Sequence, residues 1–284
     1  PSKRYEQIEI IVDAINELSR KEQYSIVSDR IVLVRYSRTS SATGSFSEDC
    51  DVRIIWGGDE TIRNIRRNMI GPRAFDITFA DRYSICVINA DKLVLDPKLM
   101  KLANDFYNDT YLFDQNACTS PHLVVWIGSK SNVIHSKKLF WTSVESATKN
   151  RYSIQAVQAV DKLTNFYSQA IQSDSIIHTV GKDNLIWRVE LTELSEGIED
   201  FQCSSGYFSE YHATDLAELF AIINKKYQTL SYYGFSNSEL NDFINRSKPS
   251  GIDRIVPVGR TMDFSMIWDG YNLIETLTRK IEII

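Results

Sequence analysis

The sequence has few of the residues that build metal centres and disulfide frameworks. Its 284 residues include only four cysteines and four histidines. They form no CxxC pair and no Cys/His cluster at metal-ligand spacing, so neither a structural zinc site nor a disulfide framework is indicated. We therefore predict that the chain has no metal site and resides in a reducing cytoplasm, with free thiols at Cys50, Cys86, Cys118 and Cys203.

Long apolar runs and an excess of positive charge are also missing. No apolar run approaches the roughly 18 residues that a membrane span needs, and there is no signal-peptide pattern. The formal net charge is −5, which argues against nucleic acid or an anionic membrane surface as the main partner. We expect no nucleic-acid binding and no membrane span.

What the sequence does contain is an alternation of helical and extended patterns. Apolar residues at helical spacing predict a first helix from Ile8 to Leu18. An Asp96-Pro97 start and a Ser236-x-x-Glu239 capping box predict two more helices. Short apolar or β-branched runs predict strands at residues 30–36, 52–56, 77–79, 84–88, 123–127 and 185–191. The rhythm favours an α/β fold with an open, mostly parallel sheet covered by helices.

Cys118 is the first candidate for a covalent nucleophile. It lies in the segment Phe113-Asp114-Gln115-Asn116-Ala117-Cys118-Thr119-Ser120-Pro121, among polar residues that join a predicted helix to a predicted strand. A thiol on such a loop is reachable and close to backbone N–H groups that favour its thiolate. The alternative is an ordinary loop cysteine.

A second candidate is the turn Trp56-Gly57-Gly58-Asp59-Glu60-Thr61, which joins a predicted strand to a predicted helix. Glycine lets the backbone approach a ligand, and the free N–H groups of a helix start attract a phosphate or a nicotinamide cofactor. Asp59 and Glu60 suit the helix dipole but would repel a phosphate. The motif is neither GxGxxG nor a Walker motif, so a tight turn with acidic capping stays open as the alternative.

Two other features give weaker indications of a functional site. His122 lies four residues after Cys118 and is an acid/base candidate, although in an extended segment the two side chains are too far apart for a direct pair. Ser204-Ser205-Gly206 is interpreted as a turn.

Five segments, taken in order, resemble the aldehyde dehydrogenase superfamily. The chain is most similar to its acyl-CoA reductase branch, which includes the long-chain fatty acyl reductase of bacterial bioluminescence. The resemblance covers almost the whole chain and rests on residues 51–62, 80–84, 114–121, 253–259 and 268–271.

The resemblance implies an aldehyde dehydrogenase-like α/β fold, with part of a Rossmann-type cofactor domain and an α/β catalytic domain. We expect a partial cofactor domain at 1–113, a catalytic thiol domain at 114–250 and a C-terminal segment at 251–284 that returns to the domain interface. Family members are longer at the N-terminus and this chain starts at Pro1. We therefore expect a C-terminal portion, without the Asn side chain of the oxyanion hole.

The resemblance also implies the roles of individual residues. Cys118 would be the acyl-accepting nucleophile, with Asn116 of the same motif in the catalytic set. The cofactor would bind at Gly57, Gly58, Glu60 and Thr61. The cofactor expected is NADPH, with NADH as the alternative.

Two departures from the superfamily pattern matter. Phe79 stands where hydrolytic aldehyde dehydrogenases carry the Glu that activates water, and its loss suits an enzyme that keeps a thioester until hydride arrives. The Glu-x-Phe-Gly-Pro segment that holds the nicotinamide ribose has no clear counterpart near Cys203 to Tyr207.

The resemblance therefore implies an acyl-CoA reductase that reduces a fatty acyl thioester to the aldehyde through an acyl-cysteine. The expected partners are fatty acyl-CoA or an acyl-protein thioester, acyl-transferring subunits and further copies of the chain in a homo-oligomer. Two alternatives stay open. One is a cysteine acyltransferase or thioesterase without hydride transfer, and the other is a non-catalytic fragment that serves assembly.

Overall fold

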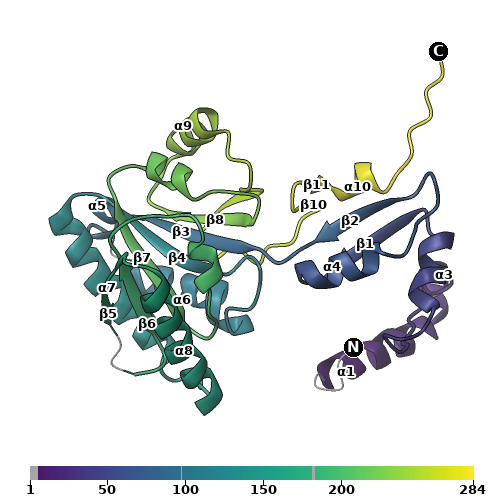
Figure 1. Cartoon of the computed structure of the whole chain (residues 1–284), viewed down its shortest axis with the longest axis horizontal. Helices are drawn as coiled ribbons and strands as arrows, with labels where there is room; N and C mark the ends of the chain where they lie inside the picture. Colours follow the sequence, from purple (N-terminus) through teal and green to yellow (C-terminus); the bar gives the residue numbers. More distant parts are fainter. Residues whose placement is uncertain (1–5, 97, 181–182) are drawn as a thin grey trace. The chain divides into compact units, whose positions relative to one another are not determined.

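The computed structural model describes residues 6–96, 98–180 and 183–284. The chain divides into two compact units, Pro1–Thr78 and Phe79–Ile284 (Figure 1). The boundary expected at 113/114 therefore differs from the division of the structure, because residues on both sides of it belong to one sheet of the second unit.

The first unit consists of short helices and a two-stranded sheet. Its elements are α1 (Glu6–Ser19), η1 (Glu22–Tyr24), α2 (Ser25–Ser28), α3 (Ala42–Asp49), β1 (Val52–Trp56), α4 (Asp59–Arg66) and β2 (Phe75–Phe79), which ends one residue past the division. Arg53 on β1 binds Asp76 on β2 through both carboxylate oxygens, at 2.7 and 3.0 Å. The hydrogen bond from Arg53 lowers the pKa of the Asp76 carboxyl, so this nearly buried pair stays charged.

The strand predicted at residues 30–36 is wrong. Residues 31–37 have no regular secondary structure, and no strand of the described ranges pairs with them. Their apolar side chains are exposed, Val32 to 82%. A β-branched run forms a strand only where a neighbouring strand takes up its backbone hydrogen bonds.

The second unit is built on a seven-stranded sheet with the order β5-β6-β7-β4-β3-β8-β9. All neighbouring strands in it are parallel except β5 and β6, as the alternation of helices and strands predicts. The strands are β3 (Tyr83–Asn89), β4 (Pro121–Ile127), β5 (Ile176–Val180), β6 (Trp187–Leu191), β7 (Tyr207–Ala213), β8 (Tyr227–Tyr233) and β9 (Arg254–Pro257). A short hairpin follows, made of β10 (Ile267–Trp268) and β11 (Tyr271–Asn272).

Helical segments connect the strands of this sheet. They are α5 (Ala90–Leu93), α6 (Leu99–Thr110), η2 (Tyr111–Phe113), α7 (Lys130–Thr148), α8 (Ala156–Gln172), η3 (Ile198–Phe201), η4 (Leu216–Ala221) and α9 (Asn237–Ser247). The short helix α10 (Leu273–Thr276) follows the hairpin. The capping box predicted at Ser236 and Glu239 is confirmed. The helix start predicted at Asp96-Pro97 is not compared with the structure, because Pro97 lies outside the described residues. No helix in the described parts of the chain is both long and apolar enough for a membrane crossing.

Two apolar cores cover the two faces of the sheet. Phe106 of α6 and Phe140 of α7 pack with Trp126 on one face, their rings meeting edge to face. The other face is covered by η4 and α9, with Leu219 and Phe243 in that core. Successive side chains of the central strands point to opposite faces of the sheet and so enter the two cores in turn. Because both faces are buried, β3 and β4 are apolar along most of their length. The sheet is therefore a rigid base for the loops at its ends.

Candidate active site

Cys118 lies on the loop between η2 and β4, at the amino end of a central strand. The loop starts with two left-handed residues, Asp114 (φ 52°) and Gln115 (φ 59°). These reverse the chain after the helix, so that Cys118 comes three residues before the fully buried strand β4. The segment is therefore an ordered turn, and the polar composition that singled it out serves its hydrogen bonds.

Gln115 holds this loop against the start of β7. Its Nε2 donates to the carbonyls of Pro121 and Tyr207, both at 2.9 Å. Its Oε1 accepts from the N–H groups of Gly206 and Tyr207, at 2.8 and 3.0 Å. The side chain is 1% exposed, so all four bonds form away from water. Gln115 thus fixes the loop between two neighbouring strands.

The segment Ser204-Ser205-Gly206 is more than the turn predicted from the sequence. Ser205 N donates to the carbonyl of Asp114 at 2.8 Å, so the turn binds the cysteine loop directly. At Gly206 (φ 88°) an added Cβ would lie 2.2 Å from the carbonyl of Leu185. Only glycine fits this position.

Hydrogen bonds of three further residues fix the second half of the cysteine loop. The hydroxyl of Ser84 donates to the carbonyl of Cys118 at 2.6 Å and accepts from the N–H of Thr229 at 3.1 Å. Ser120 Oγ donates to the carbonyl of Asp109 at 2.7 Å. The carboxylate of Asp109 accepts from the N–H groups of Gly259 and Thr261, at 2.6 and 3.1 Å, which ties the segment after β9 to the same place.

The thiol of Cys118 is half-buried, and its Sγ lies 4.0 Å from the carbonyl of Ala80. Burial raises the pKa of this thiol, and the nearby carboxylates of Asp81 and Asp269 raise it further. The N–H groups of Arg82 and of Cys118 itself lower the pKa but do not outweigh burial. The expectation that this loop favours the thiolate is therefore wrong for the free protein.

His122 does not serve Cys118. Its Nδ1 lies 3.2 Å from the carbonyl of Cys203, and its ring stacks on Tyr83 with 5.6 Å between centroids. Burial lowers the pKa of His122 to about 4, so the ring is neutral at physiological pH. The residue fills the core at the start of β4.

The remaining predicted residues around the thiol are placed as follows. Asn116 is exposed, and its N–H donates to the carbonyl of Phe113 at 2.8 Å. Phe79 is buried directly before Ala80, with its ring edge-on to Tyr271 at 6.2 Å. An apolar ring thus occupies the position that the resemblance gives to a water-activating Glu. Sequence reasoning missed Gln115, Ser84 and Asp269, although all three lie in the segments that carry the resemblance.

The glycine turn of the first unit connects β1 to α4. Gly58 is the residue before the helix, and a Cβ added to it would meet nothing within 4 Å. A Cβ at Gly57 would lie 3.1 Å from the methyl group of Thr61. Glu60 is exposed, and its carboxylate accepts a hydrogen bond from Asn64 at 3.0 Å. The turn therefore offers open space and the first N–H groups of a helix, next to acidic side chains.

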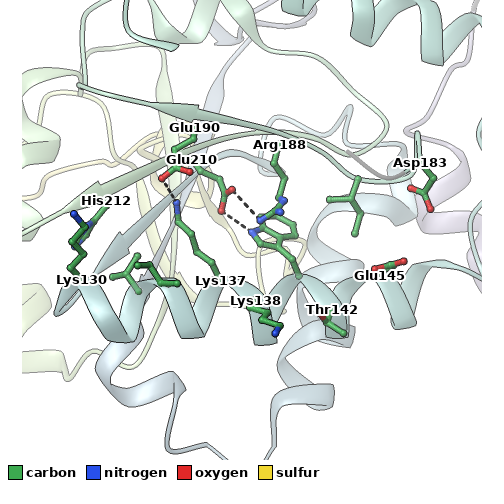
Figure 2. A pocket seen from close by; sticks show the side chains of 14 residues that line it. Lys130, Lys137, Lys138, Thr142, Glu145, Asp183, Arg188, Glu190, Glu210 and His212 are labelled. Carbon is green, nitrogen blue, oxygen red and sulfur yellow. Dashed lines mark hydrogen bonds and ion pairs between the residues drawn. The ribbon is translucent and has the colours of Figure 1, made fainter. Parts of the chain in front are cut away.

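A cavity of about 560 Å³ runs along α7 where this helix crosses β6 and β7 (Figure 2). Glu210 lies at its floor and accepts from the indole N–H groups of Trp126 and Trp141, at 2.8 and 2.7 Å. Its other oxygen faces Arg188 at 3.4 Å, while Lys137 pairs with Glu190 at 2.9 Å. These charges neutralise one another, and Cys118 does not line the cavity. The cavity is therefore not the site of thiol chemistry.

A family model described as acyl-CoA reductase (LuxC) matches residues 9–280. The chain belongs to the acyl-CoA reductase (LuxC) family. Among curated proteins, none matches the chain significantly. The family assignment agrees with the resemblance carried by the motifs around Gly57 and Cys118.

Solved structures of aldehyde dehydrogenases share the fold. A putative methylmalonate-semialdehyde dehydrogenase from Sinorhizobium meliloti 1021, complexed with NAD, has a TM-score of 0.52 and 13% identity, over 77% of this chain and 48% of that one. Aldehyde dehydrogenase 21 from Physcomitrella patens, in complex with the reaction product succinate, has a TM-score of 0.53 and 10% identity, over 78% and 47%. The chain thus spans about half the length of these two proteins. At such identities the similarity establishes the aldehyde dehydrogenase-like fold.

Proposed function

We propose that the chain supplies the acyl-accepting thiol of a fatty acyl-CoA reductase, which reduces a long-chain acyl thioester to the aldehyde. The observation that carries the proposal is Cys118, a free thiol on a loop locked by Gln115 and Ser84 at the amino end of β4. Membership of the acyl-CoA reductase (LuxC) family supports it. The acyl donor is a coenzyme A thioester or a protein-bound thioester.

In this reaction the Sγ of Cys118 attacks the carbonyl carbon of the thioester, and the donor thiol leaves. The negative charge that develops on the carbonyl oxygen needs hydrogen-bond donors. The N–H of Cys118 is suited to this role, because it donates to no other residue's acceptor within the described parts of the chain. The product is an acyl-cysteine.

The surroundings of the thiol suit an intermediate that must not be hydrolysed. Phe79 offers no proton acceptor to a water molecule, and it packs against Tyr271 beside the carbonyl that faces the thiol. The acyl group would therefore stay on Cys118 until it is reduced.

The proposed reductant is a reduced nicotinamide cofactor, NADPH in preference to NADH, which supplies the hydride when bound. Gly57, Gly58, Glu60 and Thr61 are the residues proposed to hold it. The open space at Gly58 and the N–H groups at the start of α4 fit a cofactor backbone. The preference for NADPH rests on the resemblance to the family, whereas the Glu60 carboxylate fits a ribose hydroxyl and favours the alternative, NADH. Acyl-transferring subunits and a homo-oligomer are proposed as partners.

The test is acylation of the purified protein by radiolabelled fatty acyl-CoA. We expect one label per chain in the wild type and in Cys203→Ala, and none in Cys118→Ala, because only the loop thiol is positioned to attack. Label retained by the Cys118→Ala variant would contradict the proposal. Oxidation of the nicotinamide coupled to aldehyde release distinguishes a reductase from an acyltransferase or thioesterase, which shows neither.

A further inference from the structure

Acylation of Cys118 requires a group that takes the thiol proton. Because burial raises the pKa of this thiol, little thiolate exists at neutral pH before the substrate arrives. His122 is bound to the carbonyl of Cys203, and Phe79 has no basic atom. Two carboxylates, Asp81 and Asp269, lie near enough for their charges to act on the thiol.

Asp269 lies at the tip of the β10–β11 hairpin. Trp268 pairs with Tyr271, so Asp269 (φ 48°) and Gly270 (φ 76°) form the two-residue turn between the strands. Asp-Gly is a preferred pair for such a turn, which explains the residue types but not their burial. Asp269 is only 7% exposed, and its Oδ1 accepts a hydrogen bond from Gln228 Nε2. A carboxylate needed only for the turn would face water.

The hairpin tip and the cysteine loop are held at the same end of the sheet. The Ser84 hydroxyl connects the carbonyl of Cys118 to the N–H of Thr229, and the adjacent Gln228 binds Asp269. On the other side, the ring of Tyr271 meets Phe79, directly before the Ala80 carbonyl that faces the thiol. Two independent sets of contacts therefore connect the Asp269 turn to the residues that surround the thiol.

Asp269 has charged neighbours before β3 and on β9. Burial raises the pKa of its carboxyl, and the hydrogen bond from Gln228 and the charges of Arg82, before β3, and Arg254, on β9, lower this pKa without outweighing burial. Asp253, next to Arg254, also has a raised pKa, through its own burial. A carboxylate with a raised pKa is a stronger base than an exposed one.

We propose that Asp269 is the proton acceptor for Cys118 in acyl transfer. This rests on the proposed function. The Asp269 carboxylate takes the proton from Sγ, directly or through one water molecule, as the new S–C bond forms. The C–S bond to the donor then breaks, and the carboxyl returns the proton to the departing thiolate. No oxidant or reductant takes part, and Asp269 ends the step as a carboxylate.

Asp81 provides the matched control. It also acts electrostatically on the thiol, but its side chain is exposed, and its Oδ2 is 3.5 Å from Gln202 Nε2. Replacing either Asp with Asn removes one negative charge near Cys118. Only replacement of Asp269 removes the proposed proton acceptor.

The experiment compares wild type, Asp269→Asn and Asp81→Asn by two measurements across a range of pH. One is single-turnover acylation by labelled acyl-CoA, and the other is alkylation of Cys118 by iodoacetamide, which needs no proton acceptor. We expect Asp269→Asn to slow acylation by about 10²- to 10⁴-fold. Its alkylation profile should move to lower pH, because the thiolate has lost a negative neighbour. Asp81→Asn should also move the alkylation profile, with little loss of acylation.

Slower acylation together with alkylation at lower pH distinguishes proton transfer from a structural role, because a distorted loop would slow both reactions. Asn also suits the hairpin turn, so the variant should fold. As a second variant, Asp269→Glu retains a proton acceptor and should recover part of the rate. If wild type and Asp269→Asn are labelled equally fast, then the proposed role of Asp269 is wrong, while the proposed function stands. A wild type that takes no label would overturn the proposed function, and this role with it.

Discussion

At Cys118, burial and electrostatics act on the same thiol in opposite ways. The N–H groups of Arg82 and of Cys118 favour the thiolate, but burial and two carboxylates favour the protonated thiol. A protonated nucleophile is inert toward oxidants and metals until a base removes its proton. The reactivity of this residue is therefore coupled to its neighbours, above all Asp269.

At the same scale, the stability of the protein should depend on the protonation of His122. Burial holds the folded-state pKa of this ring at about 4, against 6.5 for the free side chain. The unfolded chain therefore binds more protons between these values, and stability is lost as pH falls through them. The full effect is about 3 kcal/mol.

Urea unfolding of wild type and His122→Asn at several pH values would measure this. The wild-type free energy of unfolding should fall more steeply with decreasing pH than that of the variant. Parallel curves would show that His122 is not the group responsible.

The residues of the site were predictable to different degrees. Cys118 could be found from its polar neighbours and from Pro121, because these are local signals. The role of Gln115 could not be predicted, because its partner Tyr207 is 92 positions away and only the folded sheet brings the two residues together. The burial of Asp269 is equally non-local, although its Asp-Gly turn is visible in the sequence.

At the scale of elements, the cysteine loop depends on the side chain of Gln115, which joins β4 to β7. Gln115→Ala would leave two carbonyls and two N–H groups without these partners in a buried place. We expect a loss of about 3 kcal/mol in the free energy of unfolding, and slower acylation of a Cys118 that is chemically intact. Urea unfolding and single-turnover acylation measure the two effects.

Gln115→Glu is the matched control for this prediction. It keeps the oxygen that accepts from Gly206 and Tyr207 but loses both donations from Nε2. Because its second carboxylate oxygen would face the carbonyls of Pro121 and Tyr207 in a buried place, its stability should fall at least as far as that of Gln115→Ala. An alanine variant as stable as the wild type would show that the loop is held by other contacts.

Local patterns predicted β3, β4 and β6 of the large sheet, missed β5, β7 and β8, and failed where a partner strand decides the outcome. The strands at 84–88 and 123–127 were predicted correctly because two-sided burial makes them continuously apolar. Residues 30–36 are also rich in β-branched and apolar residues, although they include Arg30 and Arg35, and they form no strand in the structure. Composition records the propensity of a segment, whereas pairing depends on what lies beside it.

At the scale of the molecule, the two units differ in what each buries. All seven strands of the large sheet and both apolar cores belong to residues 79–284. The first unit has a two-stranded sheet and leaves large apolar side chains such as Ile10, Val32 and Trp56 exposed. The boundary expected at 113/114 came from motif positions, which do not reveal that β3 and β4 are neighbours in one sheet.

The distribution of buried surface predicts that residues 79–284 fold without residues 1–78. A domain of this size with a complete core is expected to unfold cooperatively, whereas an isolated two-stranded sheet is marginal. We expect the shortened chain to show a single urea transition and near-ultraviolet circular dichroism typical of packed aromatic residues. We also expect it to retain alkylation of Cys118 with the same dependence on pH, because every group that acts on the thiol lies in this unit. A chain 1–78 prepared in parallel should show no cooperative transition. If the shortened chain instead binds hydrophobic dyes and unfolds gradually, then the sheet depends on the first unit for its packing, and the thiol should lose its pH profile together with its fold.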